Sequence, residues 1–416
     1  MSNTSGDGSP AASTGPWRWL VTTPLFVRIL FGLVFGVVIG VLLGPDARSF
    51  DTPAKLILRL LGALAPALIL VAVVRAIMTA EIHGRLAFRL VRLLLLNTLV
   101  AILVGLGVAN LIRPGEGVAL PAPARVAPLK TDIMAQILDN VPDSLVRPFV
   151  ENKVIAVVFI ALLFGVAARG LHGSQRRVAE DLIGLAFSCI VRVLHWVIAL
   201  VPLAVLGKVA SIVGTAGFEP FLRLGMFVLA VLVALAVQAA YYLVRVRLGS
   251  WVRPFALLSQ MSDALVMAFS TASSTITMPL TYERLRTRVG LRERSASLGA
   301  LVGANFNNDG TALYEAMSAL FVAQLIGVQL SFPEQLMVIA TSVVASVGAA
   351  GIPEAGLVTM TLVFSAVGLP VEYIALLLTV DWFLDRCRTM INVLGDTNVA
   401  CLLDGKIRSV EPAASS

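Results

Sequence analysis

The sequence predicts an all-α polytopic membrane protein, and its composition, its long apolar segments and the placement of its arginines support that prediction. Hydrophobic residues occupy 58% of the 416 positions and charged residues 14%, whereas soluble domains average about a quarter charged residues. The mean hydropathy is +0.89. Several apolar runs reach the length of about 20 helical residues that crosses a hydrocarbon core of roughly 30 Å. A nucleic-acid partner is not expected, because the net charge of +7 reflects arginines in loops.

Eight transmembrane helices are expected. Residues 1–20 are rich in Ser, Gly, Ala and Pro and predict a disordered tail. The apolar stretch that follows lacks a small-residue cleavage site, so it predicts a retained span rather than a signal peptide. The predicted spans are 25–44, 56–79, 89–112, 153–171, 182–213, 220–248, 296–328 and 371–402.

Arginines concentrate in the loops that these spans place on one side of the membrane. The loop before the seventh span carries Arg284, Arg286, Arg288, Arg292 and Arg294. Loops on the other side carry fewer basic residues, mixed with Asp and Glu. Because Lys and Arg are enriched in cytoplasmic loops, both termini are expected in the cytoplasm. The expected location is a plasma membrane, in particular a bacterial inner membrane.

Two apolar segments with polar or Gly/Pro centres do not predict simple spans. Residues 255–282 have a Ser/Thr-rich middle and Pro279, and residues 333–370 are interrupted by SVGAAGIPEAG. Broken backbone at membrane depth is stable only inside protein or beside a water-filled cavity. Each segment therefore predicts a re-entrant helical hairpin before a long span. The repetition indicates inverted repeats with a site near the membrane centre.

Glycines recur every four residues on the first span, at Gly32, Gly36, Gly40 and Gly44. Small residues at this spacing predict close packing against another helix. They carry no information about a substrate.

A stripe of polar residues lies on the last span. Asp385, Arg388, Thr389, Asn392 and Asp396 are spaced i, i+3, i+4, i+7 and i+11, which is one helix face. Charges at membrane depth cost at least about 2.5–3.5 kcal/mol each, so they should face a cavity or partners. The stripe could be a salt-bridge network that only holds helices together. It also suits an amino-acid zwitterion, with a carboxylate for the ammonium, an amide for the α-carboxylate and a guanidinium for a second carboxylate.

The seventh span is interrupted by a polar run at residues 307–311. Exposed carbonyls together with Asn307 and Asp309 would form an oxygen-rich cation site, and a solvated loop is the alternative. One turn further on, Glu315 stands in an otherwise apolar helix. A buried glutamate there can carry a proton or serve as a structural hydrogen-bonding group.

These residues resemble the glutamate/aspartate transporter family, the dicarboxylate/amino acid:cation symporters that include excitatory amino acid transporters. The resemblance extends over most of the chain in hydropathy, and four motifs in order make it specific. The motifs are SSTITMP at 273–279, NNDGTALYEA at 307–316, SVGAAGIPEAGLVTM at 346–360 and DWFLDRCRTMINVLGD at 381–396.

The resemblance implies a homotrimer in the lipid bilayer that works as an elevator. A fixed scaffold would hold a mobile transport domain, and the second hairpin would be the extracellular gate. The implied scaffold is 21–80 and 127–213, the implied transport domain is 89–112 and 219–405, and 406–416 is a cytoplasmic tail.

The resemblance also implies a binding site for an acidic amino acid. Asp385 would bind the ammonium group and Arg388 the side-chain carboxylate, while Thr389 and Asn392 would bind the remaining polar groups. The other implied substrate-binding residues are Ser273, Ser274, Thr311, Ile352 and Gly356.

Coupling cations would bind at three places. One implied sodium site surrounds Asp396, a second joins Asp309 to Thr98, and a third lies at Ser346 beside the second hairpin. In the animal carriers, the glutamate that matches Glu315 is associated with proton co-transport and potassium counter-transport. The candidate metal ligands are Thr98, Gly303, Asn307, Asn308, Asp309, Ser346, Asn392 and Asp396.

The chain departs from the family pattern around these cation sites. Asn308 stands where the family has methionine and Asn305 where it has threonine, while Leu94 and Asn97 replace a tyrosine and a threonine on the third span. Amide oxygens are harder ligands than a thioether, so Asn308 could still bind sodium. The coupling ion is therefore Na⁺ and/or H⁺, with K⁺ counter-transport as a further option.

Secondary active uptake of L-glutamate or L-aspartate is the leading functional prediction. The alternatives are a proton-driven, sodium-independent transporter of acidic amino acids or other dicarboxylates, and an anion-conducting channel of the same fold. An enzyme is not predicted, because the three histidines lie on unrelated segments without a nucleophile–base pairing. No cofactor is expected.

Overall fold

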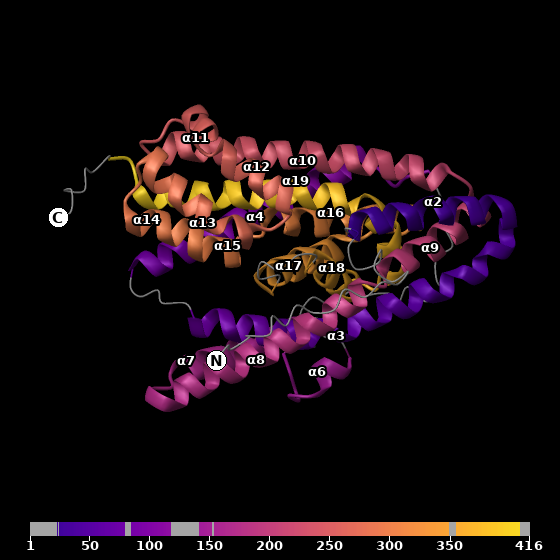
Figure 1. Ribbon diagram of the computed structural model, residues 1–416, viewed down its shortest axis with the longest axis horizontal. Coiled ribbons are helices and arrows are strands. Elements are labelled where there is room, and N and C mark those ends of the chain that lie inside the picture. The colour runs from indigo at the N-terminus through magenta and orange to yellow at the C-terminus, as the bar shows by residue number, and fades with distance from the viewer. Residues whose placement is uncertain are drawn as a thin grey trace, which may run out of the picture.

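The computed structural model describes residues 23, 25–79, 85–117, 141–151, 154–348 and 355–407, and all the regular elements in these ranges are helical. Figure 1 shows long helices aligned with the longest axis of the molecule. The predicted tail at 1–20, residues 408–416 and the centre of the second hairpin at 349–354 lie outside the described residues.

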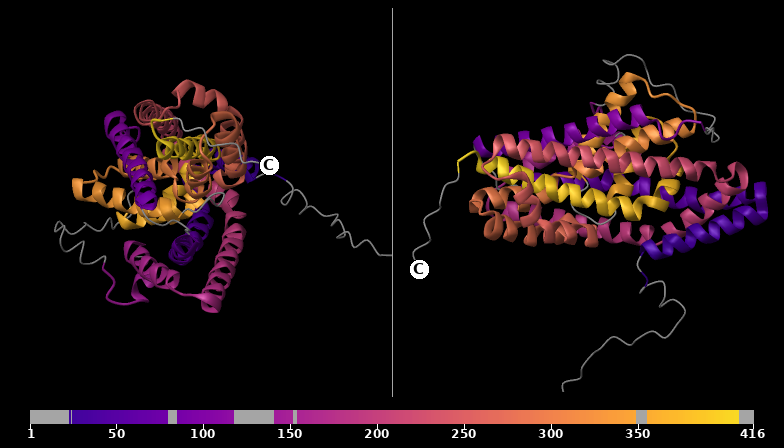
Figure 2. Two further views of the ribbon diagram at one scale, coloured as in Figure 1. Left: turned by 90° about the vertical axis from the view of Figure 1, so that its left-hand side faces the viewer. Right: turned by 90° about the horizontal axis from the view of Figure 1, so that it is seen from above.

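The first half of the chain forms one group of helices. It contains α2 (Leu25–Leu43), the 3₁₀ segment η1 (Gly44–Phe50), α3 (Asp51–Thr79), α7 (Val154–Arg169), α8 (Gly173–Ile198) and α9 (Val201–Ala216). A short helix, α6 (Arg147–Val150), precedes α7. In this group α2 packs on α9, while α3 packs on α7, α8 and α9. In the left view of Figure 2, the magenta α7 and α8 lie at the edge of the molecule, and α7 contacts α17 (Phe332–Gly348) of the C-terminal half.

The glycine stripe of α2 packs against α9 as predicted. A Cβ atom at Gly32 would lie 2.5 Å from the Pro202 carbonyl oxygen, and one at Gly36 would lie 2.7 Å from that of Leu206. Gly40 is as close to Ala210. Close packing is therefore confirmed for these three glycines. Gly44, at the turn out of the helix with a φ of +54°, has open space where a Cβ would be, but its carbonyl group packs closely against Gly214 of α9.

The single span predicted at 182–213 is wrong, because the chain forms two helices there. The first, α8, begins at Gly173 and ends at Ile198, and α9 begins at Val201. Pro202 stands in the first turn of α9. It has no backbone N–H, and its ring clashes with the carbonyl four residues earlier, so it ends the preceding helix. The apolar composition on both sides of the break hid it from a hydropathy reading.

The second half of the chain gathers around α19 (Ile374–Asp404), whose side chains are mostly buried. The helices α4 (Arg85–Ile112), α10 (Glu219–Gly249) and α16 (Asp309–Leu325) pack against it. Figure 1 shows α10 and α19 lying side by side. A 3₁₀ turn, η4 (Val371–Tyr373), leads into α19.

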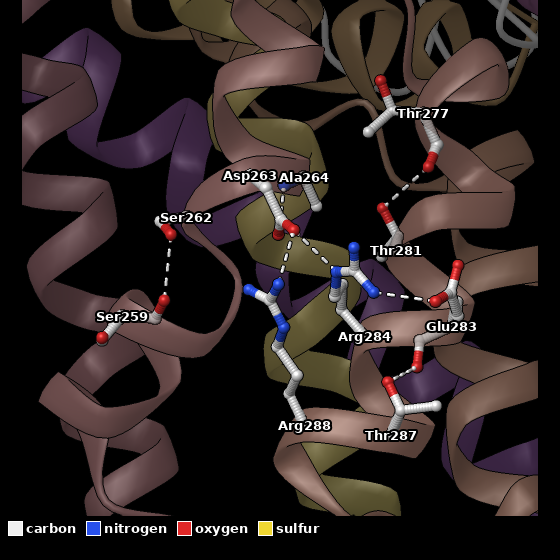
Figure 3. A network of polar contacts seen from close by, with 10 residues as sticks. All are labelled: Ser259, Ser262, Asp263, Ala264, Thr277, Thr281, Glu283, Arg284, Thr287 and Arg288. Atoms are coloured by element: carbon white, nitrogen blue, oxygen red, sulfur yellow. Dashed lines mark hydrogen bonds and ion pairs between the residues drawn. The ribbon is translucent and has the colours of Figure 1, made fainter.

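The first predicted hairpin is a pair of helices with a break between them. After α11 (Pro254–Gln260), α12 (Ser262–Thr271) and α13 (Ser274–Arg284) meet at Ala272, whose φ of +50° reverses the chain. Ser273 caps α13 by accepting a hydrogen bond from the Ile276 N–H at 3.2 Å. At the other end of the pair, Asp263 lies between Arg284 and Arg288, at 2.7 and 3.3 Å (Figure 3). A π-helical turn, η2 (Leu285–Val289), follows.

The seventh span is broken where the sequence predicts a break. It begins with α14 (Glu293–Ser297), a π-helical turn η3 (Leu298–Val302) and the short α15 (Gly303–Phe306). Asn307 and Asn308 then leave helical geometry before α16 starts. The second hairpin consists of α17 (Phe332–Gly348) and α18 (Ala355–Ala366), which pack against each other and against α16.

Within the described residues, four helical stretches are long and apolar enough to cross a membrane. Shorter apolar helices accompany them, and large apolar side chains such as Leu42 of α2, which is 77% exposed, face outward. Such a surface suits lipid and not water. The chain is therefore a multi-pass membrane protein. The four stretches are Val27–Ile57, Phe88–Ile112, Gly173–Ile198 and Glu219–Gly249.

Candidate substrate and cation site

The polar stripe of α19 is buried among neighbouring helices. Arg388 is 1% exposed, Asn392 4% and Asp396 1%. Apolar residues of the same helix belong to the hydrophobic core, while Asn392 and Asp396 contact polar residues of the broken seventh span. Burial of this many polar groups requires partners for each of them.

The Arg388 guanidinium is held on one side only. Its Nη2 lies 2.8 Å from Asp385 Oδ1 and 3.0 Å from Asp381 Oδ1. Its Cζ lies 4.0 Å from the centre of the Tyr314 ring, a cation–π contact. Its Nε and Nη1 are buried and have no hydrogen-bond partner among the described residues. The free N–H groups of a guanidinium match the two oxygens of a carboxylate.

Asp381 and Tyr314 belong to this cluster, although the sequence reasoning missed both. Asp381 lies four residues before Asp385 and seven before Arg388, so the spacing that defined the stripe extends to it. Tyr314 gave no such signal, since an aromatic residue in an apolar helix is usually part of the core.

Several of the other predicted substrate residues meet the stripe. The Asn392 Nδ2 lies 3.5 Å from the Thr311 hydroxyl, and its Oδ1 accepts a 2.8 Å hydrogen bond from the Gly310 N–H. A Cβ atom at Gly356 would lie 3.6 Å from Arg388 Nη2, so the start of α18 approaches the guanidinium. Ile352 lies outside the described residues.

The remaining predicted substrate residues make their hydrogen bonds to backbone. Thr389 Oγ1 donates to the Asp385 carbonyl oxygen at 2.8 Å. Ser274 Oγ donates to the Ala304 carbonyl oxygen at 3.4 Å, and Ser273 caps α13. Arg386, on another face of α19, donates to the carbonyl oxygen of Phe269 at 2.9 Å and so ties the first hairpin to this helix.

Oxygen atoms gather around Asp396. Asn307 Nδ2 donates to Asp396 Oδ1 and to the Asn392 carbonyl oxygen, both at 3.1 Å. Asn307 Oδ1 is buried without a hydrogen-bond partner among the described residues. A Cβ atom at Gly303 would lie 2.7 Å from Asp396 Oδ1, so only glycine allows α15 to come this close. A small cation takes such hard oxygen ligands.

Asp309, at the start of α16, is fully buried beside two other helices. Thr98 of α4 donates to its Oδ1 at 2.7 Å, and the Tyr242 hydroxyl of α10 donates to its Oδ2. The structure thus brings together Asp309 and Thr98 across 211 positions of sequence. Tyr242 was not predicted, since it stands near the end of an apolar span.

Asn308 links the broken span to the second hairpin. Its Nδ2 donates to the Ser346 carbonyl oxygen at 2.9 Å, and its Oδ1 lies 3.5 Å from Asn392 Nδ2. The Ser346 hydroxyl donates back to Val343 in its own helix, at 3.0 Å. Asn308 therefore makes hydrogen bonds through both ends of its amide, which a thioether could not make.

Glu315 is fully buried one turn beyond this cluster. Neither carboxylate oxygen has a hydrogen bond of standard geometry within the described part of the chain. The Thr359 hydroxyl of α18 and the charge of Arg388 both act on it. Glu315 therefore combines full burial with few polar partners for its carboxylate.

Comparison with known proteins agrees with this arrangement. The sodium:dicarboxylate symporter family matches residues 25–406. Excitatory amino acid transporter 4 of Mus musculus is 38% identical over 260 residues, which are 60% of this chain and 45% of that protein. Excitatory amino acid transporter 3 of Mus musculus is 36% identical over 250 residues, 59% of this chain and 47% of that protein. Excitatory amino acid transporter 1 of Ambystoma tigrinum is 28% identical over 422 residues, which are 85% of this chain and 76% of that protein.

The chain spans about half the length of the first two of these relatives. The family match covers nearly all of the chain, and it confirms the resemblance drawn from the four motifs. The chain belongs to the sodium:dicarboxylate symporter family, a family of transporters.

Proposed function

We propose that the protein is a secondary active symporter that takes up L-glutamate or L-aspartate with a cation gradient. The observation that carries the proposal is the one-sided Arg388, whose Nε and Nη1 have no hydrogen-bond partner among the described residues. A buried cation with unused donors is costly unless an anion completes it. A substrate carboxylate is the partner that this geometry favours.

The second charged end of the substrate would bind beside it. Asp385 has one oxygen on Arg388 and keeps a 21% exposed side chain, so its other oxygen can accept from an ammonium group. Thr311, Asn392 and Gly356 border the same space. Thr389, with Ser273, Ser274 and Ile352 of the two hairpins, would complete the site.

Coupling would use the oxygen-rich clusters next to the substrate site. Asp396, Asn307 and Gly303 with Asn392 make the first proposed cation site, and the unpaired Asn307 Oδ1 supports it. Asn308 and Ser346 make a second site at the second hairpin. Asp309 and Thr98 form a third cluster of oxygens. The charges around this cluster differ from those around the first two.

The packing of the helices supports an elevator. The helices of 21–80 and 127–213 pack mainly on one another, as do those of 89–112 and 219–405. We assign the first set to a scaffold and the second to a transport domain, within a homotrimer. Both termini would be cytoplasmic in a bacterial inner membrane, as the arginine distribution predicts.

Uptake into proteoliposomes tests the proposal. Purified protein is given labelled L-aspartate or L-glutamate with an inward Na⁺ gradient, an inward H⁺ gradient or an outward K⁺ gradient, one at a time. Concentrative uptake under one of the inward cation gradients is expected. Ionic currents without accumulation would instead identify an anion channel, and competition by a dicarboxylate without an ammonium group would point to a broader substrate class.

A second candidate, proton coupling without sodium, is favoured by Glu315 alone. Its carboxylate is fully buried and has few partners, so it can gain and lose a proton during the cycle. Glu315→Gln keeps the shape and removes the titration. If protons drive uptake, this variant retains substrate binding and exchange but loses uptake driven by a pH gradient. If Glu315→Gln still accumulates substrate under a proton gradient as the wild type does, Glu315 does not have this role.

A further inference from the structure

The charge balance around Asp309 differs from that of the other cation clusters. Asp309 is fully buried, and both of its oxygens already accept hydrogen bonds, from Thr98 and Tyr242. Hydroxyl donors do not neutralise a carboxylate. At membrane depth, a charge without a counter-charge is expensive, so Asp309 requires positive charge nearby.

Arg245 of α10 supplies that charge from within the chain. It stands three residues after Tyr242, so the two side chains share one face of the helix. Its Nη1 donates to Asn97 Oδ1, and its Cζ lies 5.4 Å from the centre of the Tyr241 ring. Among the described residues, it is the cation whose charge acts on Asp309. The guanidinium and the Asp309 carboxylate form no ion pair or hydrogen bond within the described residues, so the positive charge acts on Asp309 through space.

A hydrogen-bonded network keeps Arg245 at this position. Asn97 Nδ2 lies 3.5 Å from Asn398 Oδ1, and Asn398 Nδ2 donates to the Tyr242 carbonyl oxygen at 2.9 Å. Gln238 Nε2 lies 3.4 Å from the Asn97 carbonyl oxygen. These hydrogen bonds tie α4, α10 and α19 together around Asn97, the side chain that accepts from Arg245. A fixed cation is the expected result of such a network.

The same atoms would otherwise suit a small cation. Asp309, Thr98 and Asn97 offer carboxylate, hydroxyl and amide oxygens, which are ligands for a hard ion. Arg245 occupies the amide oxygen of Asn97 and balances the charge of Asp309. Both contributions remove the reason for an ion to bind there.

We propose that Arg245 is a resident cation of the Asp309 cluster, which takes the place of one dissociable Na⁺. The inference rests on the proposed function, and it specifies the coupling of that function. A tethered charge moves with the protein and returns with it, so it contributes no energy from an ion gradient. Transport would therefore use one cation fewer than an otherwise identical protein that lacked Arg245.

Sodium binding to the substrate-free protein tests the inference directly. The full chain is purified in detergent, and its melting temperature is measured as NaCl replaces choline chloride at constant ionic strength. Arg245→Met removes the charge and keeps most of the length. By mass action, the variant should gain a Na⁺-dependent rise of several degrees, on the order of 2–5 °C, beyond that of the wild type.

Two matched variants control for charge and position. Arg245→Lys retains a cation and should respond to Na⁺ as the wild type does. Arg247→Met removes an exposed arginine two residues further along α10 and should also match the wild type. A response of Arg245→Met no larger than that of Arg247→Met would overturn the proposal.

Asp309→Asn makes the test independent of whether Arg245→Met folds. If the Asp309 cluster holds no Na⁺ in the wild type, this isosteric variant shows the wild-type response to Na⁺. Loss of part of the response would mean that Na⁺ binds at Asp309, against the proposal. In the double variant Arg245→Met/Asp309→Asn, the extra response should disappear; its persistence would place the added Na⁺ elsewhere.

Uptake provides the second readout. The number of Na⁺ ions taken up with each L-aspartate, obtained from the Na⁺ gradient that just balances a given L-aspartate gradient across proteoliposomes, should rise by about one in Arg245→Met, because one more ion crosses in each cycle. An unchanged number would contradict the inference. If the wild type transports no acidic amino acid, the proposed function fails, whereas the melting experiment still decides the role of Arg245.

Discussion

Helix α19 contains two contacts between aspartate and arginine, one near its C-terminal end and one near its middle, and the two contacts differ in completeness. Near the C-terminal end, Asp404 Oδ1 accepts from the backbone N–H and Nε of Arg292, at 3.1 and 2.9 Å, and Oδ2 accepts from Trp251 at 2.7 Å. In the middle, Arg388 uses only Nη2 for its two aspartates.

This difference is the ground on which we distinguish a structural contact from the proposed binding site. Both carboxylate oxygens of Asp404 have partners, so the contact holds the loop before α14 against the helix end and needs nothing more. Arg388 lies at greater depth with unused donors, which is unfavourable unless a ligand completes the site. The sequence reasoning could not distinguish the two, because both are charged residues on one helix.

The largest effect is expected from breaking the incomplete contact. Arg388→Ala removes both the carboxylate partner and the counter-charge of Asp381 and Asp385. Loss of one partner of a buried pair costs about 2–5 kcal/mol, so affinity for L-aspartate should fall on the order of 100-fold or more. Arg388→Lys keeps the positive charge but not the two-pronged guanidinium, and its affinity for L-aspartate should fall by less than that of Arg388→Ala.

Proteoliposome uptake at saturating gradient measures this change, and monodisperse elution in detergent establishes that each variant is folded. Arg177→Ala, which removes an exposed arginine of α8, is the matched control. Wild-type affinity in Arg388→Ala would show that its free donors do not bind substrate.

An intermediate effect on stability, without an effect on transport, is expected from the complete contact. Asp404→Ala leaves Trp251 and Arg292 without their acceptor. Hydrogen bonds to a charged group contribute about 1.5–3 kcal/mol, so the melting temperature should fall by several degrees. Glu219→Ala breaks a partly exposed ion pair and should change stability by less than about 1 kcal/mol. Uptake per folded molecule should stay unchanged in both; a selective loss in Asp404→Ala would remove the distinction.

The smallest effect concerns acid. Asp404 lies beyond the predicted span that ends at residue 402. Burial acts to raise its pKa. Hydrogen bonds from Trp251 and Arg292 outweigh burial and hold the pKa below its ordinary value. A lowered pKa in the folded state stabilises the protein at pH values above the ordinary aspartate value of about 3.9. The contribution is lost as the pH falls below that value. The melting temperature of Asp404→Asn should therefore decline less between pH 5 and 3 than that of the wild type, by roughly 1–2 °C. Parallel declines would show that Asp404 titrates normally.

Much of the architecture was predictable because hydropathy and glycine spacing report on local chain properties. The helix at Leu25–Leu43 and the break after Phe306 occur where composition indicates them. The break before α9 was missed, because the residues on either side of Pro202 are uniformly apolar and a hydropathy window averages over one proline. Within the candidate site, the sequence predicted the proximity of residues that share one helix, as Asp385 and Arg388 do.

The sequence alone determined the class of the protein, the polar face of α19 and the family motifs, because helical periodicity and burial follow from the order of residues. Only the tertiary structure decided which donors remain free, since that depends on atoms of other helices. It brought Tyr314 over Arg388, Thr98 onto Asp309 and Arg245 onto Asn97. Such contacts join residues up to 211 positions apart, and a change in the packing of two helices would rearrange them without altering any local pattern.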